Sequence, residues 1–114
     1  MKLKIYHNPQ CKKSRAALQF LKDHNHEVDV REYLKQPLTE QEFEKLLVKL
    51  NLPVAEMVRT QEAEYKSRYK GKTFTEQEWV KILLASPRLI RRPIIERDFK
   101  AVIGDPIENI DAVI

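Results

Sequence analysis

Hydrophobic and polar positions alternate with a period of two at the start of the chain. Leu3 and Ile5 are the apolar members of residues 2–6, and the alternation returns in residues 27–33, so both stretches are predicted strands. Between them, apolar residues recur at helical spacing: Ala17, Leu18 and Leu21. A crossover of this length favours parallel pairing of the two strands.

The middle of the chain has helical periodicity. Two Thr-x-x-Glu capping boxes, Thr39 with Glu42 and Thr75 with Glu78, precede apolar stripes that predict helices over residues 39–50 and 75–86. Two short helices, 54–58 and 62–69, are expected between them. Residues 39–86 are therefore predicted to form a helical insertion without a linker.

Strand patterns return near the end of the chain. The apolar runs 92–96 and 99–103 are joined by Arg97-Asp98, which predicts a hairpin. A terminal helix is expected to follow, with Asp105 as N-cap, Pro106 at its first position, and an inner face of Ile110, Val113 and Ile114. The predicted fold is an α/β sandwich with a mixed sheet, in the order β-α-β, helices, β-β-α.

Composition narrows the class of protein. The 114 residues suit a single domain, 1–114, and 42% hydrophobic with 33% charged residues is typical of a soluble globular chain. The net charge of +4 suits an anionic small molecule as well as nucleic acid. With only 2 glycines, the chain has no glycine-rich phosphate loop.

The chain has a single cysteine, Cys11, so it cannot form an intramolecular disulfide. We expect a cytoplasmic protein, because the first residues do not resemble a signal peptide. No membrane partner is expected, since no apolar run approaches the ~18 residues that span a bilayer.

Cys11 falls at the predicted junction of the first strand and helix. A helix N-terminus has N–H groups without intrahelical partners and favours negative charge, and His7, Lys12, Lys13 and Arg15 are close in sequence. These features lower the pKa of a thiol. The alternatives are that Cys11 is a small buried hydrophobe and that the lysines are solvated surface charges.

Ser14 is three residues after Cys11, where its hydroxyl or its N–H could donate to the sulfur or to a bound anion. Ordinary helix capping is the other interpretation. Because the pattern is Cys-x-x-Ser, any disulfide formed in turnover must involve another molecule.

The run Ile5-Tyr6-His7-Asn8-Pro9-Gln10-Cys11-Lys12-Lys13-Ser14-Arg15, with Arg59 in Val58-Arg59-Thr60-Gln61-Glu62 and Arg92-Pro93-Ile94 later, resembles the glutaredoxin-linked arsenate reductase (ArsC) family. Spx-type transcription regulators are relatives of that family. The resemblance covers essentially the whole chain and implies a thioredoxin-like fold with a mixed four-stranded sheet.

Carried over residue by residue, the resemblance makes Cys11 the nucleophile, and the residues supporting it would be His7, Ser14 and Pro93, the last as a cis-proline. The oxyanion ligands would be Arg15, Arg59 and Arg92. Independently of the family, guanidinium groups bind tetrahedral oxyanions through paired donors. Taken singly, Arg59 and Arg92 could also be surface charges.

One departure from the family pattern concerns Asp105. Where these reductases usually have an arginine after the last strand, this chain has a carboxylate. If Asp105 faces the site, its charge lowers anion affinity and raises the pKa of Cys11. The other interpretation is that it caps the last helix.

The remaining candidates predict little chemistry. His24 and His26 have no nearby Cys or His, so we expect surface histidines and no metal site. Trp79 with Ile82 and Leu83 is a predicted core stripe, and we expect no nucleic-acid partner.

The leading hypothesis is an enzyme in which the Cys11 thiolate attacks arsenate or a similar oxyanion. Glutathione would be the co-substrate and glutaredoxin the partner that resets the enzyme, as the resemblance implies, with no tightly bound cofactor. A second hypothesis is a glutathione-linked thiol oxidoreductase acting on another substrate because of Asp105. A third is an Spx-like protein that binds RNA polymerase, although the Cys-x-x-Cys switch typical of those regulators is absent.

Overall fold

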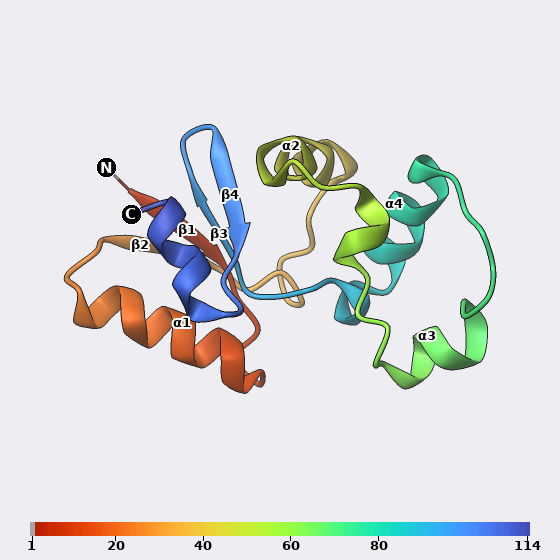
Figure 1. Cartoon of the computed structure of the whole chain (residues 1–114), viewed down its shortest axis with the longest axis horizontal. Coiled ribbons are helices and arrows are strands. Elements are labelled where there is room, and N and C mark those ends of the chain that lie inside the picture. Colours follow the sequence, from red (N-terminus) through yellow and green to blue (C-terminus); the bar gives the residue numbers. More distant parts are fainter. Residues whose placement is uncertain (1) are drawn as a thin grey trace. The chain divides into compact units, whose positions relative to one another are not determined.

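The computed structural model describes residues 2–114 and shows the predicted order of strands and helices (Figure 1). The strands are β1 (Leu3–Tyr6), β2 (Val28–Arg31), β3 (Ile94–Arg97) and β4 (Lys100–Ile103). The α-helices are α1 (Lys12–Asp23), α2 (Glu40–Leu50), α3 (Ala63–Arg68) and α4 (Glu76–Ala85). Short 3-10 helices cover η1 (Val54–Met57), η2 (Pro87–Leu89) and η3 (Ile107–Ala112).

The four strands form one mixed sheet in the order β2-β1-β3-β4. Strand β1 pairs in parallel with β2, as predicted, while β3 is antiparallel to both β1 and β4. The register places Tyr6 opposite Ile94. The residues that follow β1 and the residues that precede β3 are therefore neighbours at the same end of the two central strands.

The described residues form two compact units, one of residues 2–36 with 92–114 and the other of residues 37–91. The first unit contains the sheet, α1 and η3. The predicted helical insertion, 39–86, falls inside the second unit. That the whole chain is a single domain stays a prediction.

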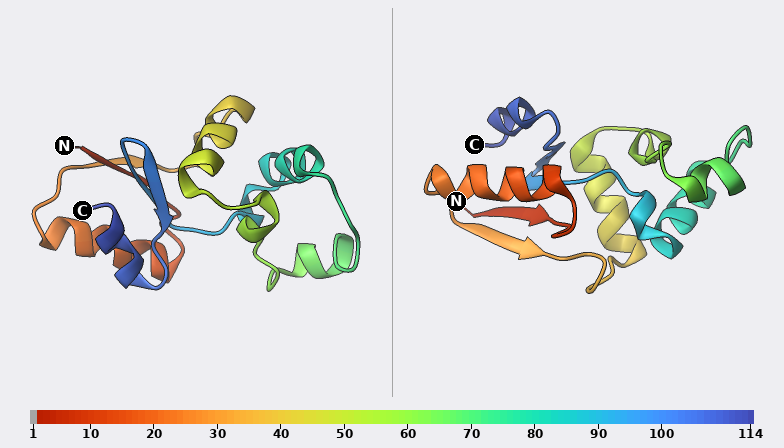
Figure 2. Two further views of the ribbon diagram at one scale, coloured as in Figure 1. Left: turned by 45° about the horizontal axis from the view of Figure 1, so that its top comes forward. Right: turned by 90° about the horizontal axis from the view of Figure 1, so that it is seen from below.

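The core of the first unit lies between the sheet and two helices. Helix α1 and η3 pack on the same face of the sheet (Figure 2). The fully enclosed members of this cluster come from the strands and from both helices: Leu3, Ile5, Ala17, Leu21, Ile95 and Ile110. Burying these side chains fixes α1 against β1, which determines where the residues between them lie.

The second unit contains both predicted capping boxes. Thr39 accepts the N–H of Glu42 and Thr75 that of Glu78, and each glutamate side chain accepts the N–H of its threonine. Trp79 is buried, as predicted, and contacts Tyr69 and Phe74 in an aromatic cluster.

The terminal helix differs from the prediction. It is a 3-10 helix with Pro106 at the N-cap, and no side chain caps it. Asp105 instead forms an ion pair with Lys13 at 2.8 Å, so the prediction that Asp105 is the N-cap is wrong. Ile110 and Val113 are buried as expected, whereas Ile114 is 39% exposed.

The hairpin turn is also displaced from its predicted position. Arg97 pairs with Lys100, so the turn residues are Asp98 and Phe99 rather than Arg97 and Asp98. Asp98 has φ of 54°, a left-handed conformation that Asp tolerates better than most residues. The turn therefore needs a left-handed residue at position 98, and aspartate adopts that conformation at a lower cost than most residues other than glycine.

Within residues 2–114, no helix combines the length and the hydrophobicity that crossing a membrane requires. The same residues contain no group of three or more His, Cys, Asp or Glu arranged to hold a metal ion. His24 hydrogen-bonds the Phe20 carbonyl at the end of α1.

The capping box of α4 gives a stability prediction. Thr75→Ala removes the acceptor for the Glu78 N–H, and we expect it to lower the free energy of unfolding by about 1 kcal/mol. Urea denaturation measures the change. Thr73→Ala, an exposed position two residues earlier, is the matched control, and an equal loss in both variants would contradict the capping role.

Candidate active site

The loop between β1 and α1 is a tight turn from Asn8 to Cys11. The Cys11 N–H donates to the Asn8 carbonyl at 3.0 Å, with Pro9 at the second turn position, which proline favours. The Asn8 side chain accepts the N–H of Gln10 at 3.0 Å. These bonds bring the chain from the end of β1 directly to the first residue of the helix.

Cys11 is the N-cap of α1, with an extended backbone (φ −94°, ψ 122°), as predicted from the position of the strand-to-helix junction. Its carbonyl accepts the Arg15 N–H at 3.0 Å, the first bond of the helix. Its side chain is partly exposed, and its thiol is free. The sulfur therefore lies where the N–H groups of the first helical turn converge.

Burial acts to raise the pKa of Cys11, but hydrogen bonds and charge outweigh it. The Ser14 N–H, the Arg92 guanidinium and the Lys13 N–H all donate to the sulfur, and the positive charge of Arg92 adds to their effect. The net result is a pKa below the ordinary thiol value. These donors stabilise the thiolate, which is the nucleophilic form of cysteine.

Arg92 reaches Cys11 from the other end of the chain because of the sheet register. It precedes Pro93 and β3, and Ile94 lies opposite Tyr6. The Arg92-Pro93 peptide bond is cis, as the resemblance implied, and the Pro93 carbonyl accepts the Gly104 N–H at 2.8 Å.

Beneath the cysteine loop lies a buried polar network. The Ser14 hydroxyl contacts His7 Nδ1 at 2.6 Å and accepts the Asn8 N–H at 3.0 Å, and all three residues are buried. Of the two possibilities for Ser14, the structure therefore assigns its N–H to the sulfur and its hydroxyl to this network.

His7 is 6% exposed, and burial is the largest influence on its pKa. The charges of Lys22 and Arg15 add to the effect of burial, whereas Glu32 opposes it, and the net pKa is below the ordinary histidine value. A neutral imidazole fits its position, since Nδ1 contacts the Ser14 hydroxyl. His7 thus positions Ser14 through the contact with its hydroxyl, and Ser14 donates its N–H to the Cys11 sulfur.

The three arginines predicted as oxyanion ligands, Arg15, Arg59 and Arg92, belong to different parts of the structure and have different partners. Arg15 is exposed on α1 and donates to the Pro9 carbonyl at 3.0 Å. Arg59 belongs to the second unit, where its guanidinium forms an ion pair with Glu62 and its N–H donates to the Leu89 carbonyl at 2.7 Å. The structure brings together Cys11, Ser14, His7 and Arg92, while the role of Arg59 stays a prediction.

Asp105 is neither a helix cap nor an isolated carboxylate. Its Oδ2 lies 2.8 Å from Lys13 Nζ, and both side chains are at least 36% exposed. Lys13 also donates its backbone N–H to the Cys11 sulfur. The carboxylate therefore neutralises a cation of the same helical turn that holds the sulfur.

Two residues that support the site, Asn8 and Asn109, are not predicted by the sequence patterns above. Asn8 closes the cysteine loop with its side chain, and the Asn-Pro dipeptide is the signal that would have indicated this turn. Asn109 donates from its side chain to the Ile103 carbonyl at 3.0 Å and so braces the turn that carries Asp105. No sequence pattern distinguishes Asn109, because its partner is a backbone atom of β4.

A cysteine at the start of the first helix, beside a mixed sheet with a cis-proline before its third strand, defines a thiol protein of the thioredoxin-like class. The chain belongs to the ArsC family, whose model matches residues 6–113.

Named relatives extend this comparison. The chain is 35% identical to an arsenate reductase of Neisseria meningitidis serogroup A, over 98% of this chain and 97% of that one. It is 36% identical to the uncharacterized protein YfgD of Escherichia coli, over 95% and 92% of the two chains. The structure of an arsenate reductase from Vibrio cholerae superimposes with a TM-score of 0.94 at 31% identity, covering 100% of this chain and 98% of that one.

The hydrogen-bond donors around Cys11 predict that its thiol titrates at a lower pH than the thiol of free cysteine. The ultraviolet absorbance of the thiolate, followed against pH with Cys11→Ser as blank, should give a midpoint below that of free cysteine. Arg92→Gln should raise the midpoint, because it removes both a donor and a positive charge. Arg91→Gln is the matched control, since Arg91 donates to the Glu56 carbonyl. A wild-type midpoint at or above that of free cysteine would contradict the assignment.

Burial of His7 predicts a pH dependence of stability. Since the folded-state pKa is lowered, the contribution of His7 is present above the unfolded pKa, about 6.5, and is lost as pH falls through the folded pKa. In the Cys11→Ser background, urea denaturation should show stability falling as the pH is lowered below about 6.5. His7→Gln should flatten this dependence, and the same slope in both proteins would show that His7 is not its source.

Proposed function

We propose that this protein is a thiol-dependent arsenate reductase in which Cys11 is the nucleophile. The observation that carries the proposal is the set of donors on the Cys11 sulfur: two backbone N–H groups and the Arg92 guanidinium. A thiolate with these partners is both charged and accessible, since Cys11 is partly exposed. The arsenate reductases of Neisseria meningitidis and Vibrio cholerae, which resemble this chain over nearly its full length, support the choice of substrate.

Arginine side chains would bind the oxyanion through their guanidinium groups. Arg92 already donates to the sulfur, so a tetrahedral anion next to Cys11 would share its guanidinium. Arg15 and Arg59 are the further proposed ligands. Each has a protein partner in the structure, Pro9 for Arg15 and Glu62 for Arg59, which the anion would replace or share.

The chemistry requires two thiols. The Cys11 thiolate attacks arsenic and an oxygen leaves as water, which gives a sulfur–arsenic bond. A glutathione thiolate then attacks the Cys11 sulfur, that bond breaks, and its electron pair stays on arsenic, which is released as arsenite. The thiols are oxidised to a disulfide between Cys11 and glutathione. Another thiol, supplied by glutaredoxin, reduces this disulfide, because the chain has no second cysteine.

His7 and Ser14 act in this proposal as positioning residues. The Ser14 hydroxyl is occupied by His7 and Asn8, so Ser14 presents only its N–H to the sulfur. The buried network fixes the first turn of α1 against the end of β1. The donors therefore need no rearrangement when the thiolate forms.

The Asp105 ion pair supports a second candidate, a glutathione-linked thiol oxidoreductase that acts on a less negative substrate. The carboxylate cancels the charge of Lys13, the residue whose N–H contacts the sulfur. A unit charge at ~10 Å and an effective dielectric of ~33 is worth about 1 kcal/mol, or about fivefold in affinity. The effect on a dianion is twice as large in free energy.

An assay of arsenite formation tests the first candidate. Wild-type protein with arsenate, glutathione and glutaredoxin should release arsenite, and Cys11→Ser should reduce the rate to that without enzyme. Turnover by Cys11→Ser at the wild-type rate would contradict the proposed nucleophile. Absence of turnover in the wild type would favour the second candidate.

Charge substitutions at Asp105 separate the two candidates further. Asp105→Asn should increase kcat/KM for arsenate, mainly through KM, by about fivefold for the monoanion and about 25-fold for the dianion, because it restores a net positive charge beside the site. Asp111→Asn, which removes an exposed carboxylate of η3, is the matched control. If both variants behave like the wild type, the Lys13 ion pair does not limit anion binding.

A further inference from the structure

Two large apolar side chains are far more exposed than any others in the described part of the chain. Phe99 is 92% exposed and Val48 is 80% exposed, whereas the next are near 40%. They belong to different units, Phe99 to the sheet and Val48 to α2. Neither contributes to the site around Cys11, so the proposed function does not explain them.

Val48 lines a groove between α2 and α4. Its apolar lining comes from Leu47, Val48, Val54 and Val80, and its volume is about 460 Å³. Glu44, Glu76 and Gln77 are the polar residues of its lining. Among residues 2–114, no lysine or arginine forms an ion pair with either glutamate. The groove therefore offers apolar contact beside two carboxylates that no cation of these residues neutralises, although Glu76 also accepts the Val54 N–H at 3.2 Å.

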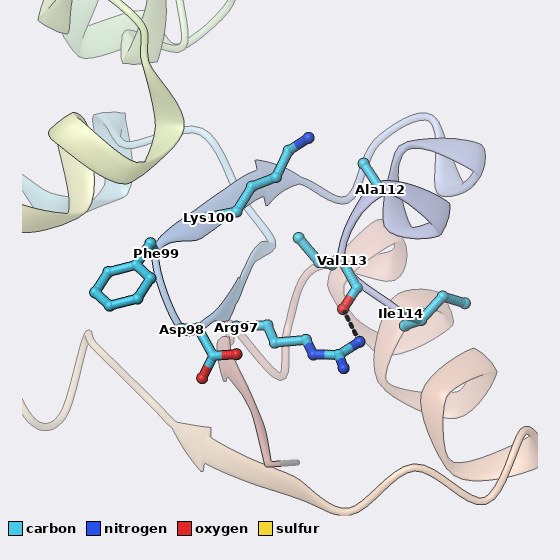
Figure 3. Close-up of a pocket in the computed structure, with 7 residues that line it drawn as sticks. All are labelled: Arg97, Asp98, Phe99, Lys100, Ala112, Val113 and Ile114. Carbon is cyan, nitrogen blue, oxygen red and sulfur yellow. Dashed lines mark hydrogen bonds between the residues drawn. The ribbon is translucent and has the colours of Figure 1, made fainter.

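Phe99 lies at the tip of the β3–β4 hairpin. Figure 3 shows a second hollow beside this tip, between the hairpin and residues 112–114, with the Phe99 ring pointing away from it. Arg97 donates to the Val113 carbonyl at 3.1 Å, which holds the base of the hairpin. The ring is thus a projecting apolar group on a supported turn.

The charge around the hairpin tip is opposite to that of the groove. Lys100 follows Phe99 and extends from the same tip, although away from the ring in Figure 3. The register that pairs Lys4 with Glu96 places Lys2 at this end of the sheet as well. At this end of the sheet three cations, Lys2, Arg97 and Lys100, outnumber two carboxylates, Asp98 and Glu27, so its net charge is positive.

We infer that the groove between α2 and α4 binds the hairpin tip of a second copy of this chain. Phe99 would insert among Leu47, Val48, Val54 and Val80, and the cations of the tip would approach Glu44 and Glu76. This pairing accounts for both exposed apolar groups at once and agrees in sign of charge. Since one aromatic anchor is a small contact, we expect a weak, concentration-dependent association.

The contact joins two different surfaces, so each can be removed separately. Phe99→Ser removes the projecting ring and keeps the groove. Val48→Lys fills the groove with a cation that can pair with Glu44 one turn earlier, and it keeps the hairpin. Both positions are exposed, so neither substitution disturbs the core. Val30→Ser, at another exposed valine on strand β2, is the matched control.

Sedimentation measurements over a concentration series, with a reductant to exclude disulfides through Cys11, provide the test. Wild-type and Val30→Ser proteins should associate equally, and Phe99→Ser and Val48→Lys should each weaken the association at least tenfold. Added salt should weaken it too. An equimolar mixture of the two variants should form a 1:1 complex, because each retains the surface that the other has lost.

Three results would overturn the inference. The wild type could remain monomeric at the highest concentration, the Phe99→Ser protein could associate as the wild type does, or the mixed variants could fail to bind. The last result, with an associating wild type, would assign the contact to a different surface. Cys11→Ser should associate normally, so the outcome is separate from the thiol chemistry.

Discussion

The candidate active site depends on the hydrogen bonds that the first turn of α1 makes to the Cys11 sulfur. Helix N-termini have donors that the helix itself cannot use, and here two of them point at a thiol. The sheet adds the third donor, because the register of β1 with β3 brings Arg92 to the same place. Hydrophobic burial of α1 against Leu3, Ile5 and Ile95 maintains this geometry.

The polar groups beneath the sulfur are costly to bury and are therefore paired with one another. His7, Asn8 and Ser14 satisfy each other through two hydrogen bonds at 2.6 and 3.0 Å. The same desolvation favours the neutral form of His7. Charge is thus concentrated on the exposed side of the loop, at the sulfur, Arg15 and Lys13, where an anionic substrate can reach it. The pairing of Lys13 with Asp105 then limits how much positive charge that side presents.

Local patterns in the sequence predicted the elements and the position of Cys11, because strand period, capping boxes and turn residues act over a few neighbours. They gave wrong predictions where the conformation or contacts of a residue depend on a partner far away in the sequence. Asp105 has the sequence signature of an N-cap, but the ammonium of Lys13, 92 residues earlier in the chain, binds its carboxylate. The hairpin turn moved by one residue because pairing between β3 and β4 sets the register. That Arg92 approaches Cys11 came only from the family resemblance, since their proximity depends on the whole sheet.

The central claim is that the Cys11 thiolate attacks arsenate and ends the first half of turnover bonded to glutathione. Intact-mass analysis of the protein, after a single turnover without glutaredoxin, measures this directly. The account predicts one glutathione on Cys11 when arsenate is present and none when arsenate is omitted. An adduct that forms equally without arsenate, or arsenite release without any adduct, would contradict it.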